Sequence, residues 1–272
     1  MIESEPNQLT FNPSLDRRSL LQKGTAAGLG LFAGGLLAGC GGSGTSSVGS
    51  SSGDKSILNA AATAEALATV MYYNLINTPN GIYQQLAGNT PDQAYLVAGF
   101  EQELNHYEFL TANGGTSAAS TFYFPKNMFI DPQTTVNTLV LLEDAFIAAY
   151  LIGIRDFSSS ALKVIAGQIM GVEAEHRALA RVIAHDLNLS QTTGLNNTAE
   201  SVAPPSSTAN NLAYERTFSS ALPNISAVVT ALTPFFKPGA AGFATTTFTF
   251  ASASGNPSAN QSPVTLNDTS PS

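Results

Sequence analysis

The sequence of 272 residues has no Trp, one Cys and only three His. A single Cys cannot form an internal disulfide, so disulfide bonds cannot hold this fold together. Basic residues are also few, because 11 Lys and Arg stand against 19 Asp and Glu, and the formal net charge is −8. We therefore expect no nucleic-acid partner, since the sequence offers no basic patch that could neutralise phosphates.

The first 39 residues have the features of an export signal. Arg17-Arg18-Ser19-Leu20-Leu21 resembles a twin-arginine export motif. The Gly-rich apolar run at 26–39 is too short for a membrane-spanning helix, and it ends in Leu37-Ala38-Gly39-Cys40, which resembles a bacterial lipobox. We expect a lipid anchor on Cys40 as the mature N-terminus, with plain cleavage as the alternative. The protein would then be exported to the cell envelope or periplasm and attached to the membrane.

Four stretches have the composition and boundary signals of helices: 57–76, 90–110, 132–154 and 159–187. The third is apolar nearly all round and is expected to be central and buried. The connection at 116–132 is long for a helical bundle, which indicates that it crosses the length of the bundle between two parallel helices. This pattern predicts an all-α fold, a four-helix bundle with ferritin-like topology.

The composition divides the chain into five parts. We expect a signal peptide at 1–39, a Gly/Ser-rich tether at 40–55 and the bundle at 56–190. A linker and one further helical segment would follow at 191–238. The remainder, 239–272, is rich in Ala, Thr, Ser, Gly and Asn and is expected to be a mobile, low-complexity tail.

Two of the three His stand three residues after a Glu, in Glu103-Leu104-Asn105-His106 and Glu173-Ala174-Glu175-His176. On a helix, residues i and i+3 share a face, so each carboxylate points the same way as its imidazole. Eleven Glu in 272 residues would place a Glu at this spacing by chance only about 4% of the time for each His.

Two further Glu, Glu65 and Glu143, lie within strongly apolar helical patterns, where a lone charge would be costly to bury. Each could instead be a solvated residue or pair with an Arg, but the first three predicted helices contain no Lys or Arg before Arg155. Two divalent cations would balance the four carboxylates. The sequence therefore predicts a di-metal site in the bundle core, with the ligands Glu65, Glu103, His106, Glu143, Glu173 and His176.

Several neighbouring residues are candidates for supporting roles. Asp144 could orient a ligand His, or could be an ordinary polar position. Tyr72 and Tyr150 each lie two turns from a ligand Glu, where they could donate hydrogen bonds to the site or serve only as core packing. Glu175 is a weaker alternative ligand, and His185 suits the end of the last bundle helix.

The motifs resemble the ferritin-like superfamily, and within it the bacterial family that includes desiccation-related proteins. The resemblance covers about 57–236. It is carried by Ile57-Leu58-Asn59 leading to Glu65, by the two Glu-x-x-His motifs, and by Leu142-Glu143-Asp144. The stretch Asn211-Leu212-Ala213-Tyr214-Glu215-Arg216 also resembles the family's segment after the bundle.

The resemblance implies a particular division of the ligands. Glu103 and Glu173 would bridge two metals, while Glu65 with His106 and Glu143 with His176 would complete one metal each. Relatives often have further Glu in the first helix, where this chain has Ala68 and Val70, so Glu65 would be unsupported by a spare acidic ligand.

Mixed carboxylate and imidazole ligation suits iron or manganese, and we favour iron. The sequence thus predicts a di-iron or di-manganese oxidoreductase, ferroxidase-like or catalase-like, acting on dioxygen, peroxide or ferrous iron. The alternative is a non-enzymatic stress or desiccation-related envelope protein with a structural or vestigial metal site. A storage cage is less expected, because a lipidated N-terminus suits a closed shell poorly. The sequence does not define an oligomeric state.

Overall fold

The computed structural model describes residues 52–189, 191–193, 199–201 and 222–254. The predicted signal peptide and Cys40 lie outside the described residues. The expected all-α fold is confirmed. Four long helices make the bundle: α3 (Ser52–Asn77), α5 (Thr90–Ala112), α6 (Pro132–Asp156) and α7 (Ser160–Asp186).

The bundle helices begin where the sequence supplies capping side chains. The side chains of Asn89, Asp131 and Ser159 accept hydrogen bonds from backbone N–H groups three residues later, at the starts of α5, α6 and α7. Pro91 and Pro132 occupy the first turns of α5 and α6, where no N–H partner is needed.

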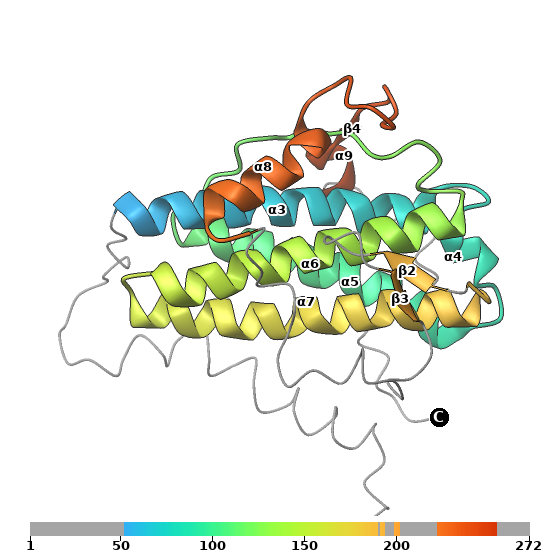
Figure 1. The fold of residues 1–272 in the computed structure, drawn as a ribbon, viewed down its shortest axis with the longest axis horizontal. Coiled ribbons are helices and arrows are strands. Elements are labelled where there is room, and N and C mark those ends of the chain that lie inside the picture. The colour runs from blue at the N-terminus through green and yellow to red at the C-terminus, as the bar shows by residue number, and fades with distance from the viewer. Residues whose placement is uncertain (1–51, 190, 194–198, 202–221, 255–272) are drawn as a thin grey trace, which may run out of the picture. The chain divides into compact units, whose positions relative to one another are not determined.

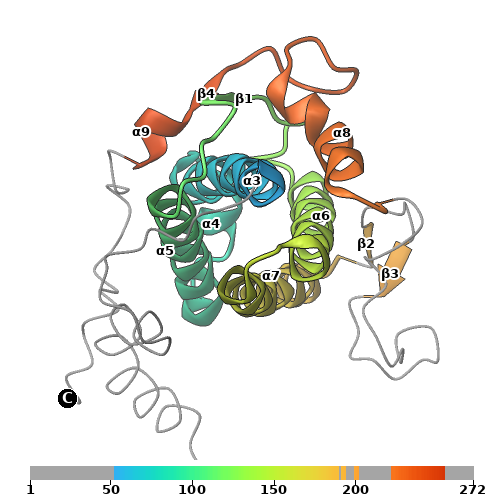
Figure 2. The same ribbon diagram turned by 90° about the vertical axis from the view of Figure 1, so that its left-hand side faces the viewer.

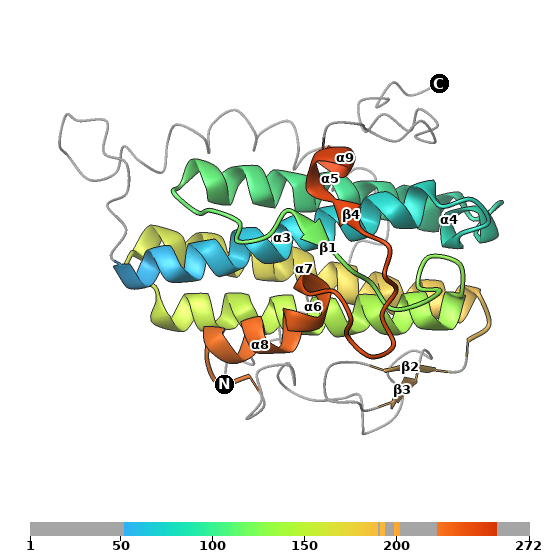
Figure 3. The ribbon, with the colours of Figure 1, turned by 90° about the horizontal axis from the view of Figure 1, so that it is seen from above.

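The helices pack as two pairs, α3 with α5 and α6 with α7, around a common centre (Figure 2). The connection from α5 to α6 runs back along the length of the bundle, so these two helices are parallel, as expected (Figure 3). The short turn after Asp156 makes α7 antiparallel to α6. A short helix α4 (Ile82–Gln85) lies between α3 and α5.

Helix α6 is the central helix that its all-round apolar sequence predicts. It is long and apolar enough to span a membrane by length and composition, but 78% of its most apolar window is buried inside the structure. Its Leu139, Leu142 and Phe146 are at most 1% exposed. The apolar character of α6 is therefore accounted for by packing within the bundle.

The described segments after the bundle contain further helices and strands. Strands β2 (Gln191–Thr193) and β3 (Ala199–Ser201) pair antiparallel, and helix α8 (Ile225–Phe236) is the expected extra helix. Beyond it, within the predicted low-complexity tail, strand β4 (Phe248–Thr249) pairs with β1 (Thr121–Phe122) of the crossover, and helix α9 (Phe250–Ser254) packs on α3. Residues 239–254 therefore form part of the fold.

The start of the bundle also differs from expectation. Helix α3 begins at Ser52, so the last four residues of the predicted tether are helical. Asp54 is 1% exposed, and its carboxylate accepts hydrogen bonds from the backbone N–H and hydroxyl of Ser158 in the α6–α7 turn. These contacts fix the first turn of α3 to the bundle, and they bring Lys55 into a helix that we expected to lack basic residues.

Candidate metal centre

The bundle brings together all six predicted ligands. Glu65 comes from α3, Glu143 from α6, and the two Glu-x-x-His pairs come from α5 and α7. The four Glu are completely buried, and His176 is 4% exposed. The ligand atoms form two groups, and the atoms of each lie within 4.8 Å of one another.

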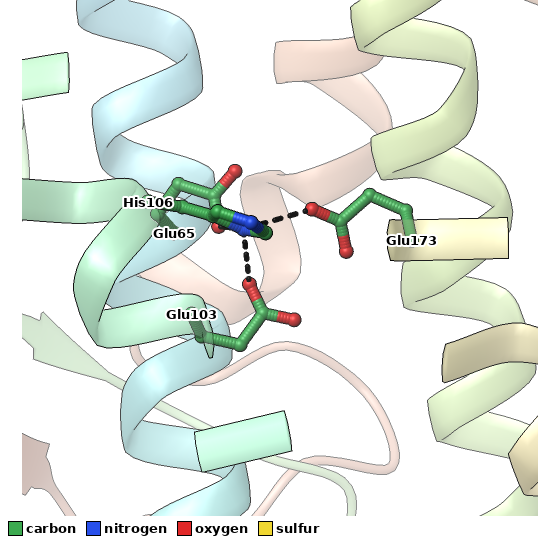
Figure 4. Close-up of side chains that lie close together, drawn as sticks. All are labelled: Glu65, Glu103, His106 and Glu173. Carbon is green, nitrogen blue, oxygen red and sulfur yellow. Dashed lines mark ion pairs between the residues drawn. The ribbon is translucent and has the colours of Figure 1, made fainter. Parts of the chain in front are cut away.

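The first group consists of Glu65, Glu103, His106 and Glu173. The Nδ1 of His106 lies 3.5 Å from Glu65 Oε2, 3.6 Å from Glu103 Oε2 and 3.3 Å from Glu173 Oε1. Figure 4 shows the imidazole facing the carboxylates of three helices. This geometry places one nitrogen and three carboxylates around a single point.

The second group consists of Glu103, Glu143, Glu173 and His176. The Nδ1 of His176 lies 2.9 Å from Glu103 Oε1, 3.3 Å from Glu173 Oε2 and 3.9 Å from Glu143 Oε1. Glu103 and Glu173 thus belong to both groups, each offering one oxygen to His106 and the other to His176. Two of the four carboxylates are therefore shared by the groups, and two are not.

The two predicted tyrosines each donate a hydrogen bond to the unshared Glu of the opposite helix. The hydroxyl of Tyr72, on α3, donates to Glu143 Oε1 at 2.8 Å, and that of Tyr150, on α6, donates to Glu65 Oε1. Burial and the nearby carboxylates raise the pKa of both phenols, so they remain protonated donors. Glu65 thus accepts from Tyr150 through Oε1 and faces His106 with Oε2, whereas Oε1 of Glu143 faces both Tyr72 and His176.

The electrostatics of the metal-free cluster follow from burial and from mutual proximity. Burial and neighbouring carboxylates raise the pKa of Glu65 and Glu143. Burial opposes ionisation of Glu103 too, but hydrogen bonds and charge from the imidazoles outweigh it and lower its pKa. Burial alone would lower the pKa of His176, yet the carboxylates raise it to about 11, and they raise that of His106 further. Protons therefore occupy the cluster when cations do not.

The residues fit a metal because several buried ligand atoms have no hydrogen-bond partner. These atoms are Glu65 Oε2, both oxygens of Glu103, His106 Nδ1, Glu143 Oε2 and Glu173 Oε1. Buried polar atoms are normally paired, so such a cluster requires an explanation. Within the described part of the chain, His106 and His176 are the only basic side chains within ion-pair distance of these carboxylates. Oxygen and nitrogen ligands around one point suit a divalent cation.

The remaining candidates lie outside the cluster. Asp144 is buried beside Glu143 and forms an ion pair with Arg177 of α7, with Oδ1 2.5 Å from Nε. Glu175 is exposed, so it is not an alternative ligand. His185 has a side chain 61% exposed and pairs with Asp186 near the end of α7.

Two residues that touch the site were not predicted. Gln102 accepts a hydrogen bond from His176 Nε2 at 2.8 Å. Gly99 lies where a Cβ would be 2.8 Å from the ring of Tyr72, so a Gly at this position lets the ring lie against α5. Gln102 directly precedes Glu103, and Gly99 lies about one helical turn before it. Their contacts with His176 and Tyr72 depend on how α5 packs against α7 and α3, which the sequence alone does not show.

Residues 53–185 match the model of a family described as a ferritin-like domain. The match includes all six residues of the cluster and supports placing the bundle in the ferritin-like superfamily. No curated protein and no solved structure matches the chain. Fold, cluster and family match together describe a ferritin-like helical protein with a buried carboxylate and histidine site that could hold a metal ion.

Proposed function

We propose that this protein binds two iron or manganese ions, iron being favoured, in a carboxylate centre at the middle of its bundle. One observation carries the proposal. Four buried carboxylates and two imidazoles from four helices converge, six of their ligand atoms have no hydrogen-bond partner, and within the described residues no Arg or Lys neutralises the carboxylates. Isolated buried charges are costly, whereas two divalent cations would compensate four carboxylates.

The shared and unshared ligands suggest how the residues would hold two ions. Glu103 and Glu173 would bridge, because each presents its two oxygens to the two groups. Glu65 with His106 would complete one position, and Glu143 with His176 the other. Tyr72 and Tyr150 would hold the unshared carboxylates in place.

A pair of ions that can each change by one electron supplies two-electron chemistry toward dioxygen or peroxide. On this basis we propose a redox role, ferroxidase-like or catalase-like, with dioxygen, hydrogen peroxide or ferrous iron as substrate. The protein's contribution would be to bind the ions and to exclude bulk water, because His106 has the most exposed side chain of the six ligands at only 12%.

We further propose that the protein acts outside the cytoplasmic membrane. The basis is the sequence alone, namely Arg17-Arg18 of the twin-arginine-like motif and Cys40 of the lipobox-like motif. Twin-arginine export carries folded proteins, which suits a bundle that takes up its metal before export. Exchange of Cys40 for Ser, with membrane fractionation and detection of the lipid, tests this part.

Metal content tests the main proposal. Purified protein loaded anaerobically with Fe²⁺ or Mn²⁺ and then desalted is expected to retain about two ions per chain. Glu103→Gln, which changes a ligand shared by both groups, should lower retention below one ion. Glu175→Gln, an exposed carboxylate on α7, is the matched control and should retain two. Retention below one ion by the unaltered protein would overturn the proposal. Spectra before and after dioxygen or peroxide test the redox role.

The near-complete burial of the ligands favours one alternative, a non-enzymatic role in which metal only stabilises the bundle. Ligands from four helices tie the whole bundle together, and binding only to the folded state stabilises it by mass action. This role would fit the family of desiccation-related proteins that the sequence resembles. It is favoured if metal raises the melting temperature while the loaded protein reacts with neither dioxygen nor peroxide.

A further inference from the structure

The two halves of the metal centre differ at one contact. The Nε2 of His176 lies 2.8 Å from Oε1 of the half-buried Gln102. An amide oxygen can only accept, so Nε2 carries the proton and donates it. The other ring nitrogen, Nδ1, then faces Glu103 and Glu173. With Nε2 held as the donor, Nδ1 is the nitrogen that would bind a cation once its own proton has left.

His106 has no corresponding partner among the described residues. Its Nδ1 faces Glu65, Glu103 and Glu173, but no residue that the structure describes forms a hydrogen bond with its Nε2, and its side chain is 12% exposed against 4% for His176. The sequence shows the same difference. Gln102 directly precedes Glu103, whereas the residue directly before Glu173 is Val172, which has no polar atom in its side chain.

We propose that Gln102 is a positioning residue that makes the two metal positions unequal. The position of Glu143 and His176 fills first and holds its ion more tightly, and the position of Glu65 and His106 is the exchangeable one. This inference rests on the proposed metal function, and it assigns an order of loading to that site.

The physical reason is preorganisation of the ligand. A metal-binding His normally donates its second N–H to an acceptor, which fixes the ring orientation and the tautomer and increases its basicity as a ligand. Gln102 supplies that acceptor for His176, whereas no described residue supplies one for His106. Loss of such an outer partner typically weakens metal binding by about 10- to 100-fold.

Zinc is a suitable probe because it is diamagnetic and binds both His nitrogen and carboxylate oxygen. Protein with ¹⁵N-labelled His is titrated with Zn²⁺, and the imidazole ¹⁵N resonances are followed by NMR, with a His106→Gln variant for assignment. At one equivalent we expect His176 to show the metal-bound shift at Nδ1 and a protonated Nε2. His106 should shift only toward the second equivalent.

Three variants test the role of Gln102. Gln102→Leu removes the acceptor. In a chelator competition, the affinity for the first Zn²⁺ ion should fall about 10- to 100-fold, and His176 should no longer show the metal-bound shift before His106 does. Gln102→Glu keeps an acceptor and should preserve both the affinity and the order. Asn105→Leu, an exposed polar residue of the same helix, is the matched control and should leave both unchanged.

The outcomes separate this inference from the proposed function. If the unaltered protein binds no Zn²⁺ and neither imidazole shifts, the metal function itself fails. If two ions bind but His106 shifts first, or if Gln102→Leu keeps the wild-type order and affinity, the metal site stands and the role of Gln102 is overturned.

Discussion

Tyr72 and Tyr150 form a crossed pair of contacts between the two helices that supply the unshared carboxylates. Each tyrosine lies seven residues after the Glu of its own helix and donates to the Glu of the other. The carboxylate oxygen that accepts the hydrogen bond is buried in each case, so its partner cannot be replaced readily by water. The hydroxyls therefore contribute to stability as well as to the position of the ligands.

Tyr72→Phe is expected to destabilise the metal-free protein by about 1–3 kcal/mol, because it leaves Glu143 Oε1 buried without its donor. Urea denaturation in the presence of a chelator measures the change. Tyr73→Phe is the control, since this neighbouring residue is half-buried and its hydroxyl makes no hydrogen bond in the described structure. Equal stability of the two variants would show that the Tyr72 contact contributes nothing.

Gly99→Ala should act on the site through the ring of Tyr72. A Cβ at this position would lie 2.8 Å from Tyr72 Cε1, so the ring or the helix must shift, at a cost of about 1–3 kcal/mol. Gly171→Ala in α7 meets nothing within 4 Å and should instead stabilise by up to about 1 kcal/mol. Thermal denaturation of the two variants should show shifts of opposite sign, and equal shifts would contradict this explanation.

At the residue scale, the convergence of the six candidate ligands was predictable, while the residues that contact them were not. The i, i+3 spacing fixes Glu103 and His106 on one face whatever the helix packs against, and four buried Glu with few cations require compensation. The contacts of Gln102 and Gly99 depend on which helices are adjacent and on how closely those helices pack. The tyrosines are intermediate, because their spacing from Glu65 and Glu143 suggested the contact but could not exclude simple packing.

The crossover between α5 and α6 is held mainly by the chain that follows the bundle. Lys126 N–H donates to the carbonyl of Gly242, Ala244 N–H to that of Phe124, and Phe250 N–H to that of Ser120. Edge-to-face contacts of Phe124 with Phe129, Phe235 and Phe248 join the same segments. The crossover and residues 235–250 are therefore joined by both backbone and aromatic contacts.

A stop codon after Lys237 should therefore loosen the crossover while the bundle helices remain. It removes the acceptor of the Lys126 N–H and the pairing of β1 with β4, so hydrogen exchange at Lys126 and Phe122 should become faster. A stop after Ser254, which removes 255–272 only, is the matched control and should leave exchange in the crossover unchanged. Unchanged exchange in the first variant would mean that the crossover is ordered independently.

At the element scale, helix boundaries were easier to predict than the C-terminal layer. Asp131-Pro132 and Ser159 cap helices through contacts within a few residues, and such contacts are visible in the sequence. Phe248 pairs with Phe122, which lies more than a hundred residues earlier, and the Ala- and Thr-rich composition around it does not identify a partner. The first helix was predicted to begin several residues after its observed start at Ser52. Its first turn is held by the contact of Asp54 with the distant Ser158, which the local sequence does not reveal.

For the molecule as a whole, the proposed metal binding would be coupled to the release of protons from the bundle core. Without metal, the pKa values of Glu65, Glu143, His106 and His176 are raised, so the folded state binds more protons than the unfolded chain. A group with a raised folded pKa stabilises fully below its unfolded pKa, and this stabilisation is lost as the pH rises toward the folded pKa. For His176 the window runs from about 6.5 to about 11. The lowered pKa of Glu103 acts only at acidic pH, outside this window.

The metal-loaded protein should have the opposite dependence, because the cations replace the protons on the same atoms. As the pH rises from about 6.5 to 9, the metal-free protein should lose stability while metal binds more tightly, so the difference between their melting temperatures should widen. Calorimetric titration with Mn²⁺ in buffers of different ionisation enthalpy should show net proton release, which Glu175→Gln should preserve. A constant difference in melting temperature together with no proton release would mean that the cations bind elsewhere, since binding at His106 and His176 requires Nδ1 of both rings to be free of its proton.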